Sequence, residues 1–133
     1  MIAAALLLLP LQASSVAATC ADFLSEAHRR PPHIAYAGCR PVPDAQGRPL
    51  RATYTLAGRD AAAVETYLAR SIGLAPLRRS CCQWDGPPRS FTDSRGREFT
   101  LSMVSEETRV TRRSAWASIH RFQITVDLLT EDI

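Results

Sequence analysis

Four cysteines constrain the fold of this 133-residue chain more than any other feature: Cys20, Cys39, Cys81 and Cys82. An even number of cysteines in an exported chain is typical of disulfides, because compartments outside the cytoplasm are oxidising. Three pairings are possible. A bridge between the neighbours Cys81 and Cys82 would close a very small ring, whereas disulfides prefer Cα separations of about 4.4–6.8 Å. We therefore expect Cys20 and Cys39 each to bond to one member of the pair.

The N-terminal segment indicates that the chain is exported. Residues 1–18 carry no charged side chain, and residues 2–9 form an unbroken apolar run. This run is shorter than the roughly 20 apolar residues that span a bilayer, so we expect no membrane span. Its length, followed by small residues at Val16 and Ala18, is typical of a signal peptide. We predict cleavage after Ala18, which leaves a single periplasmic or secreted domain of residues 19–133.

Two other interpretations of this segment stay open. The apolar run could form a helix of the core, although Pro10 interrupts it and it has no polar face. Cys20 could instead carry the lipid anchor of a lipoprotein, although Thr19 fits poorly directly before a lipidated cysteine. The basic residues that usually precede such a run are missing, which indicates that the start codon lies upstream of Met1.

Charge does not point to a nucleic-acid partner. Sixteen basic residues, all of them arginines, face thirteen acidic residues, and the net charge is only +3. Clustered arginines bind phosphates well, but here they are scattered, with no basic stripe and no interleaved aromatic residues. The chain also lacks asparagine and is rich in alanine and proline. A GC-rich coding sequence explains this bias, so we predict no nucleic-acid partner.

Alternation of apolar and polar residues predicts a sheet with one buried face. Alternation or β-forming residues occur in six segments, residues 33–39, 50–56, 77–84, 91–92, 97–105 and 120–129. The last is the most regular. In a strand over residues 77–84, Cys81 and Cys82 would point to opposite faces. Such alternation is typical of antiparallel sheets with one face in water.

Two helices complete the predicted fold. Residues 20–30 predict a short helix that stops before Pro31. Asp60 stands where an N-cap belongs, apolar residues follow at helical spacing through Ile72, and Gly73 suits the C-terminal cap. The polar residues 106–118 predict a loop with one helical turn. We therefore expect a two-layer α+β domain: an antiparallel sheet of about five to six strands, one main helix and a short N-terminal helix.

No catalytic, metal or cofactor motif stands out. The three histidines, His28, His33 and His120, show no ligand spacing, and disulfides explain the cysteines better than a metal does. We predict no metal site, no cofactor and no catalytic residue. One exception stays open, because Cys81 or Cys82, if unpaired, could act as a thiolate nucleophile beside His120.

The most individual stretch of the chain, residues 81–88, suggests a contact surface. A tryptophan beside a disulfide, followed by a rigid proline loop, could present an anchor to another protein, since aromatic residues are favoured at interfaces. Trp84, Asp85 and, in the polar segment further on, Trp116 are the candidate binding residues. The alternative is that Trp84 packs on the disulfide as part of the core.

Four short motifs carry a resemblance to a known family. They are Cys-x-Asp-Phe-Leu at residues 20–24, Gly-x-Asp-Ala-x-x-Val-Glu-x-Tyr-Leu at residues 58–68, Cys-Cys-x-Trp at residues 81–84 and Ser-Glu-Glu-Thr at residues 105–108. With these, nearly the whole mature chain resembles DUF4952, a family of bacterial exported proteins of unknown function. The resemblance implies a bacterial source and no known activity, so it adds no catalytic residue.

The leading hypothesis from the sequence is a non-enzymatic binding module. Export, small size, disulfides and the lack of a catalytic motif together favour an inhibitor or immunity-type protein that blocks a protein partner. A cysteine-dependent redox protein or enzyme that uses Cys81 or Cys82 is the first alternative. A carrier of a small ligand in the cleft between helix and sheet is the second.

Overall fold

The computed structural model describes residues 3–8 and 18–132. The elements within them are α1 (Phe23–Glu26), β1 (Ala35–Pro41), β2 (Leu50–Leu56), α2 (Gly58–Ile72), β3 (Arg78–Ser80), β4 (Gln83–Asp85), β5 (Arg89–Thr92), β6 (Glu98–Ser105), the 3₁₀ helix η1 (Arg113–Ser118) and β7 (Phe122–Leu128). Five strands form one antiparallel sheet in the order β1-β2-β7-β6-β5, and β3 and β4 pair in a second, two-stranded sheet.

The last strand of the chain lies in the middle of the main sheet. β7 pairs with β2 on one side and with β6 on the other. Its regular alternation suits this position, because a central strand buries one complete row of side chains. Phe122, Ile124 and Val126 are fully buried, while the residues between them face the other side of the sheet.

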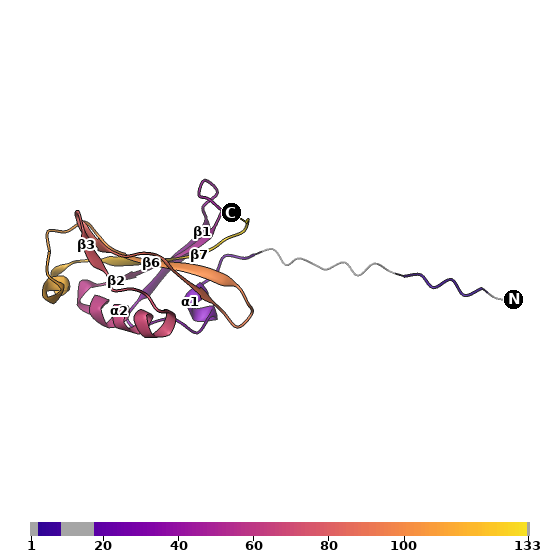
Figure 1. Cartoon of the computed structure of the whole chain (residues 1–133), viewed down its shortest axis with the longest axis horizontal. Coiled ribbons are helices and arrows are strands. Elements are labelled where there is room, and N and C mark those ends of the chain that lie inside the picture. Colours follow the sequence, from indigo (N-terminus) through magenta and orange to yellow (C-terminus); the bar gives the residue numbers. More distant parts are fainter. Residues whose placement is uncertain (1–2, 9–17, 133) are drawn as a thin grey trace.

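Helices cover one face of the sheet (Figure 1). The apolar stripe of α2, which includes Val64 and Leu68, joins one core cluster with Tyr54, Phe99 and Phe122 from the strands. The strands carry polar side chains on the alternate positions, as in the buried–intermediate pattern of β2. This arrangement confirms the predicted two-layer α+β fold.

The start of α2 differs from the prediction for a steric reason. Asp60 is not the N-cap, because the helix begins at Gly58 and its N-cap is Ala57. A Cβ atom on Gly58 would lie 2.1 Å from the carbonyl oxygen of Trp116 and 2.2 Å from that of Ile119. Only glycine lets the helix start so close to the end of η1, and its N–H donates to the Ile119 carbonyl at 3.1 Å.

The N-terminal helix is shorter than the predicted span of residues 20–30. α1 is a single turn with Asp22 as N-cap and Ala27 as C-cap. The chain then turns away at His28, whose φ of 56° lies in the left-handed region. The N–H of Arg29 closes this turn by donating to the Leu24 carbonyl at 2.9 Å. Helix termination by such a left-handed residue is common.

The predicted single strand over residues 77–84 is wrong. The chain reverses at Cys81 and Cys82, so that β3 and β4 form a tight antiparallel hairpin in which Arg79 pairs with Trp84. Cys81 adopts a φ of 51°, a conformation that turns tolerate and strands do not. The two cysteines therefore do not point to opposite faces of a strand.

The predicted disulfide pairing is also wrong. Cys20 bonds to Cys39, with a Cα–Cα distance of 5.6 Å, and Cys81 bonds to its neighbour Cys82. The first bridge ties the segment before α1 to the edge strand β1. Because the Sγ atom of Cys20 is bonded to that of Cys39, it carries no lipid in this structure.

Part of the predicted signal peptide lies outside the described residues. Within residues 3–8, no helix or strand forms, and Leu6, Leu7 and Leu8 are 85–89% exposed. A helix of the core, the alternative interpretation of the apolar run, is therefore wrong for these residues. In the described part of the chain, no helix has both the length and the apolar character needed to cross a membrane.

Candidate functional site

Polar and charged side chains gather in two places, around α1 and around the end of the β3–β4 hairpin. In Figure 1, α1 and β3 lie at opposite ends of the domain. The first, which we call the α1 network, joins α1 to β2 and to the turn between β5 and β6, and consists of Asp22, Ser25, Glu26, Arg30, Tyr54, Asp93, Arg95 and Arg97. The second, which we call the tip groove, surrounds the end of the β3–β4 hairpin and is lined by Arg79, Cys81, Cys82, Glu107, Thr108 and Arg109.

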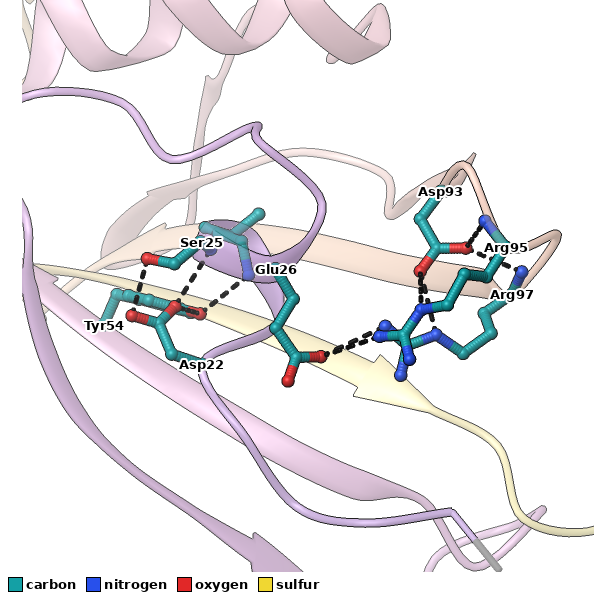
Figure 2. Close-up of polar contacts among 8 residues, drawn as sticks. Asp22, Ser25, Glu26, Tyr54, Asp93, Arg95 and Arg97 are labelled. Carbon is teal, nitrogen blue, oxygen red and sulfur yellow. Dashed lines mark hydrogen bonds and ion pairs between the residues drawn. The ribbon is translucent and has the colours of Figure 1, made fainter. Parts of the chain in front are cut away.

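The Asp22 carboxylate is the centre of the first half of the α1 network (Figure 2). The hydroxyl group of Tyr54 donates to Asp22 Oδ1 at 2.5 Å and accepts from the Leu24 N–H at 3.0 Å. Ser25 donates its N–H to Oδ1 and its hydroxyl group to Oδ2, at 3.1 and 2.8 Å. Arg30 donates to Oδ2 at 2.9 Å. These bonds fix the helix cap to the middle of β2.

The electrostatics of this pair favour a fixed ion over a reactive group. Partial burial raises the pKa of Asp22, but the hydrogen bonds from Tyr54 and Ser25 and the charge of Arg30 outweigh it and bring that pKa below its ordinary value. Burial and the hydrogen bond to Asp22 both raise the pKa of Tyr54. The phenol therefore stays protonated and the carboxylate stays ionised.

Glu26 begins the second half of the network, and its side chain points away from Asp22 towards two arginines (Figure 2). Its Oε2 atom accepts from Arg97 at 3.1 Å and from Arg95 at 3.3 Å. Arg97 also donates to Asp93 Oδ2 at 2.8 Å, and Asp93 Oδ1 accepts the N–H groups of Arg95 and Arg97. α1 is thereby fixed to the β5–β6 turn.

Two of the three carboxylates in the α1 network, those of Asp22 and Asp93, are held by several internal donors each. Burial raises the pKa of Asp93, yet the N–H and guanidinium groups of Arg97 bring it below its ordinary value. A general base needs a free lone pair within reach of a substrate proton. Asp22 accepts four hydrogen bonds, and Asp93 accepts three while its side chain is only 2% exposed. The two carboxylates therefore stabilise the fold.

Glu65 is a third internal carboxylate, buried on α2 at 6% exposure. It accepts from the Leu77 N–H at 2.8 Å and pairs with Arg113, which also donates to the Leu77 carbonyl at 3.0 Å. The guanidinium of Arg113 lies 4.3 Å from the ring centroid of Trp116. These contacts connect α2, η1 and the start of β3, and they too are structural.

The tip groove has a different character, because its reactive groups are exposed. Cys81 and Cys82 are both exposed, while Cys20 and Cys39 pack against the core. No described cysteine has a free thiol. Nucleophilic catalysis by an unpaired Cys81 or Cys82 is therefore absent from this state, and the exposed disulfide itself is the chemical feature of the tip.

A rigid base holds the exposed tip. The N–H of Thr108 donates to the Cys82 carbonyl at 2.7 Å, and Trp84 donates its backbone N–H to Ser105 Oγ at 2.8 Å. The Trp84 indole and the Arg79 guanidinium both donate to the Val110 carbonyl, at 2.9 and 3.1 Å. The hairpin and the loop after β6 thus form one unit.

The charges around the tip groove are mainly positive and unpaired. Among the described residues, Arg79 and Arg109, which line the groove, form no ion pair with a carboxylate. Glu107 is the acidic residue that lines the groove. Uncompensated guanidinium groups bind carboxylates and phosphates in bidentate fashion, so this surface is suited to an anionic ligand.

The predicted tryptophan anchors are not on the surface. Trp84 is 5% exposed and Trp116 is 2% exposed, and their rings meet edge to face with centroids 5.3 Å apart. Trp84 belongs to the core, as the alternative interpretation expected, and its ring partner there is Trp116. Trp84 nevertheless supports the tip groove from below, and Asp85, half-buried, accepts a hydrogen bond from Gln83 at 3.1 Å.

The structure does not bring the histidines and cysteines together. In the described residues, no group of three or more His, Cys, Asp or Glu side chains is placed to hold a metal ion. His33 and His120 line one surface hollow beside the start of α2, and His28 and the cysteines are not part of its lining. Neither histidine lines the tip groove.

Sequence reasoning missed Asp22, Tyr54 and Glu65 as polar partners, although signals for them exist. Asp22 precedes Phe23 with Ser25 three residues later, which is an N-cap pattern. A tyrosine on a buried strand face needs a partner for its hydroxyl group. Glu65 lies among the apolar residues of α2, where an acidic residue predicts a buried ion pair.

Comparison with known proteins gives a family and no activity. No curated protein and no solved structure matches the chain. A family model described as a domain of unknown function, DUF4952, matches residues 11–84, from the N-terminal segment through Trp84. This match spans more than half of the chain and includes both disulfides. It ends before residues 105–108, so the resemblance expected over nearly the whole mature chain is shown only as far as Trp84. The chain therefore belongs to the DUF4952 family.

Proposed function

We propose that this protein is an exported, non-enzymatic binding module that contacts an acidic protein partner through the tip groove. Exposure of the disulfide tip on a base fixed to the core is the observation that supports it. A surface that is ordered before contact loses little conformational entropy on binding. The unpaired guanidinium groups of Arg79 and Arg109 supply charge complementarity, which gives specificity and speeds association.

Export supports the same proposal. The exposed leucines at residues 6–8 contribute nothing to the core, as befits a segment that is removed. The Cys20–Cys39 bridge begins two residues after the predicted cleavage site and keeps the new N-terminus next to β1. Mass spectrometry of the protein recovered from the periplasm or the medium tests this step. A mass that begins at Thr19 is expected, and retention of residues 1–18 in the cytosol contradicts export.

The binding proposal is tested by capture from an extract of the same compartment. Exported protein in its oxidised form is immobilised, and proteins retained under native conditions are identified and compared for charge. Arg109→Glu reverses a charge in the groove, and Arg40→Glu makes the same change on the exposed edge strand β1. We expect acidic proteins to be retained by the wild type and Arg40→Glu, and to be lost with Arg109→Glu. Equal retention by both variants, or none by the wild type, overturns the proposal.

A cysteine-dependent redox protein is the second candidate function. The observation in its favour is the exposure of Cys81 and Cys82 in a groove that they share with two arginines. Structural disulfides are usually shielded, whereas labile and catalytic ones are exposed.

The third hypothesis from the sequence, a small-ligand carrier, has less support. Val64 and Leu68 of α2 and Phe99 and Leu101 of the sheet are 0–1% exposed, so side chains fill the space between helix and sheet. A hollow of about 730 Å³ instead lies on the outer side of α2 and is open to solvent. A thermal-shift screen with small apolar ligands tests this hypothesis.

A further inference from the structure

We propose that the Cys81–Cys82 disulfide is a reversible redox site that exchanges with dithiols, while Cys20–Cys39 stays closed. This inference rests on the second candidate function and names its substrate class. Thiol–disulfide exchange requires a thiolate to reach one sulfur of the bridge. The two bridges differ in this respect, because Cys81 and Cys82 are exposed at a hairpin tip and Cys20 and Cys39 pack against the core.

The tip groove provides room for the attacking group. It has a volume of about 390 Å³ and both cysteines contribute to its lining. A dithiol small molecule or the protruding active-site cysteine of a reducing protein can therefore reach a sulfur without unfolding of the hairpin. Cys20 and Cys39, by contrast, are partly buried and packed against the core.

The charges of the groove favour the reaction. Arg79 and Arg109 line it together with the cysteines, and neither guanidinium is paired with a carboxylate among the described residues. Cations close to a thiol stabilise its thiolate form. They therefore stabilise both the approaching thiolate and the thiolate that leaves when the bridge opens. Glu107 opposes this effect from the same wall.

The hairpin does not depend on its disulfide. Its register is set by three residue pairs between β3 and β4. The Thr108 N–H bond to the Cys82 carbonyl and the two bonds donated by Trp84 anchor it to the neighbouring loop and to Ser105. We therefore expect the domain to stay folded in both redox states.

The exchange proceeds through a mixed disulfide. One thiolate of the dithiol attacks the sulfur of Cys81 or Cys82, which breaks the Sγ–Sγ bond, forms a mixed disulfide and releases the other cysteine as a thiolate that takes up a proton. The second thiol of the reductant then loses its proton and attacks the mixed disulfide. The reductant leaves as a disulfide, and the protein has gained two electrons and two protons as two thiols. An oxidised dithiol returns it by the reverse steps.

The test uses the full oxidised protein and dithiothreitol as the dithiol. Samples are quenched with iodoacetamide at increasing times, and peptide mass spectrometry gives the labelling of each cysteine. Cys81 and Cys82 are expected to label together, at least about tenfold faster than Cys20 and Cys39. Circular dichroism should be unchanged while only the tip is reduced, and oxidised glutathione should restore the bridge.

Variants assign the reaction to the tip groove. Arg109→Gln is expected to slow reduction about two- to threefold, the effect of one exposed charge, and Arg40→Gln on β1 is expected to leave the rate unchanged. Equal labelling rates for the two disulfides, loss of sheet signal when the tip is reduced, or an equal effect of both arginine variants overturns the proposal. Partner capture by the oxidised protein is independent of these rates, so failure of one proposal leaves the other intact.

Discussion

The α1 network and the tip groove contain the same kinds of residue and use them differently. In the α1 network each carboxylate meets two or more donors, and arginines lie between acids. In the tip groove, Arg109 forms no ion pair among the described residues, and the disulfide faces solvent. Where every polar group is matched inside the chain, the gain is stability. Where groups remain unmatched on a rigid base, they are available to another molecule.

The two disulfides differ in the same way, since one packs against the core and the other is exposed. Among the proposed variants, their removal should give the largest difference in unfolding free energy. The chain-entropy model gives about 3 kcal/mol for a bridge that closes a loop of the size of Cys20–Cys39, and about 1 kcal/mol or less for neighbours. We expect Cys20→Ser with Cys39→Ser to lower the free energy of unfolding by about 3 kcal/mol, measured in urea. Cys81→Ser with Cys82→Ser is the control. A larger loss at the tip would contradict the contrast.

A second test removes one hydroxyl group from the centre of the α1 network. Tyr54→Phe leaves the buried Leu24 N–H without its acceptor and takes a donor from Asp22. Unsatisfied buried groups of this kind cost about 1–3 kcal/mol. Tyr36→Phe is a matched control, because Tyr36 lies against the Tyr54 ring, is 39% exposed and forms no side-chain hydrogen bond in the described part of the chain. Equal losses of unfolding free energy in Tyr54→Phe and Tyr36→Phe would show that the Tyr54 hydroxyl group contributes nothing to stability.

The layers of the fold follow from patterns that the sequence displays. Strands β2, β6 and β7 alternate over seven or eight residues and are buried on one side as predicted. α2 ends at Gly73, whose φ of 77° is the left-handed cap expected there. These elements are decided by the burial of one face, which is a local and periodic property, and prediction from sequence works well for them.

The positions of Cys81, Cys82 and Trp84 could not be predicted from the alternation of apolar and polar residues. The Cα separation that most disulfides prefer argued against a bridge between Cys81 and Cys82. The chain turns at these two residues, and they are bonded to each other there. Their Cα atoms are 3.8 Å apart because the residues are neighbours in the chain. Trp84 looks like a surface anchor beside a proline loop, yet the hairpin turns it into the core against Trp116. Both outcomes depend on which way one short hairpin folds back, and its three-residue strands give too weak a pattern to predict it.

Acid should weaken the α1 network. Asp22 and Asp93 have pKa values below the ordinary 3.8 in the folded chain. The unfolded chain therefore binds protons at higher pH than the folded chain does. The stability from these groups is complete above about pH 4, near the unfolded pKa, and is lost as the pH falls through the folded pKa. Denaturation at a series of pH values should show this loss, and Asp22→Asn should make it smaller. If the unfolding free energy of Asp22→Asn depended on pH as steeply as that of the wild type, Asp22 would not cause the loss in acid.

The smallest expected effects come from one substitution, arginine to glutamine, placed at three positions. Arg97 is 25% exposed and bonds two carboxylates, so its loss should cost about 1 kcal/mol. Arg95 is 62% exposed and shares the same acids at longer distance, so its loss should cost a few tenths of that. Arg109 forms no ion pair within residues 3–8 and 18–132, so its replacement should leave the unfolding free energy unchanged. The ranking of the three variants reverses for the rate at which a dithiol reduces Cys81–Cys82, because only Arg109→Gln should change that rate. If Arg109→Gln destabilised the fold as much as Arg97→Gln does, its guanidinium would belong to the internal structure, and the distinction between the two regions would fail.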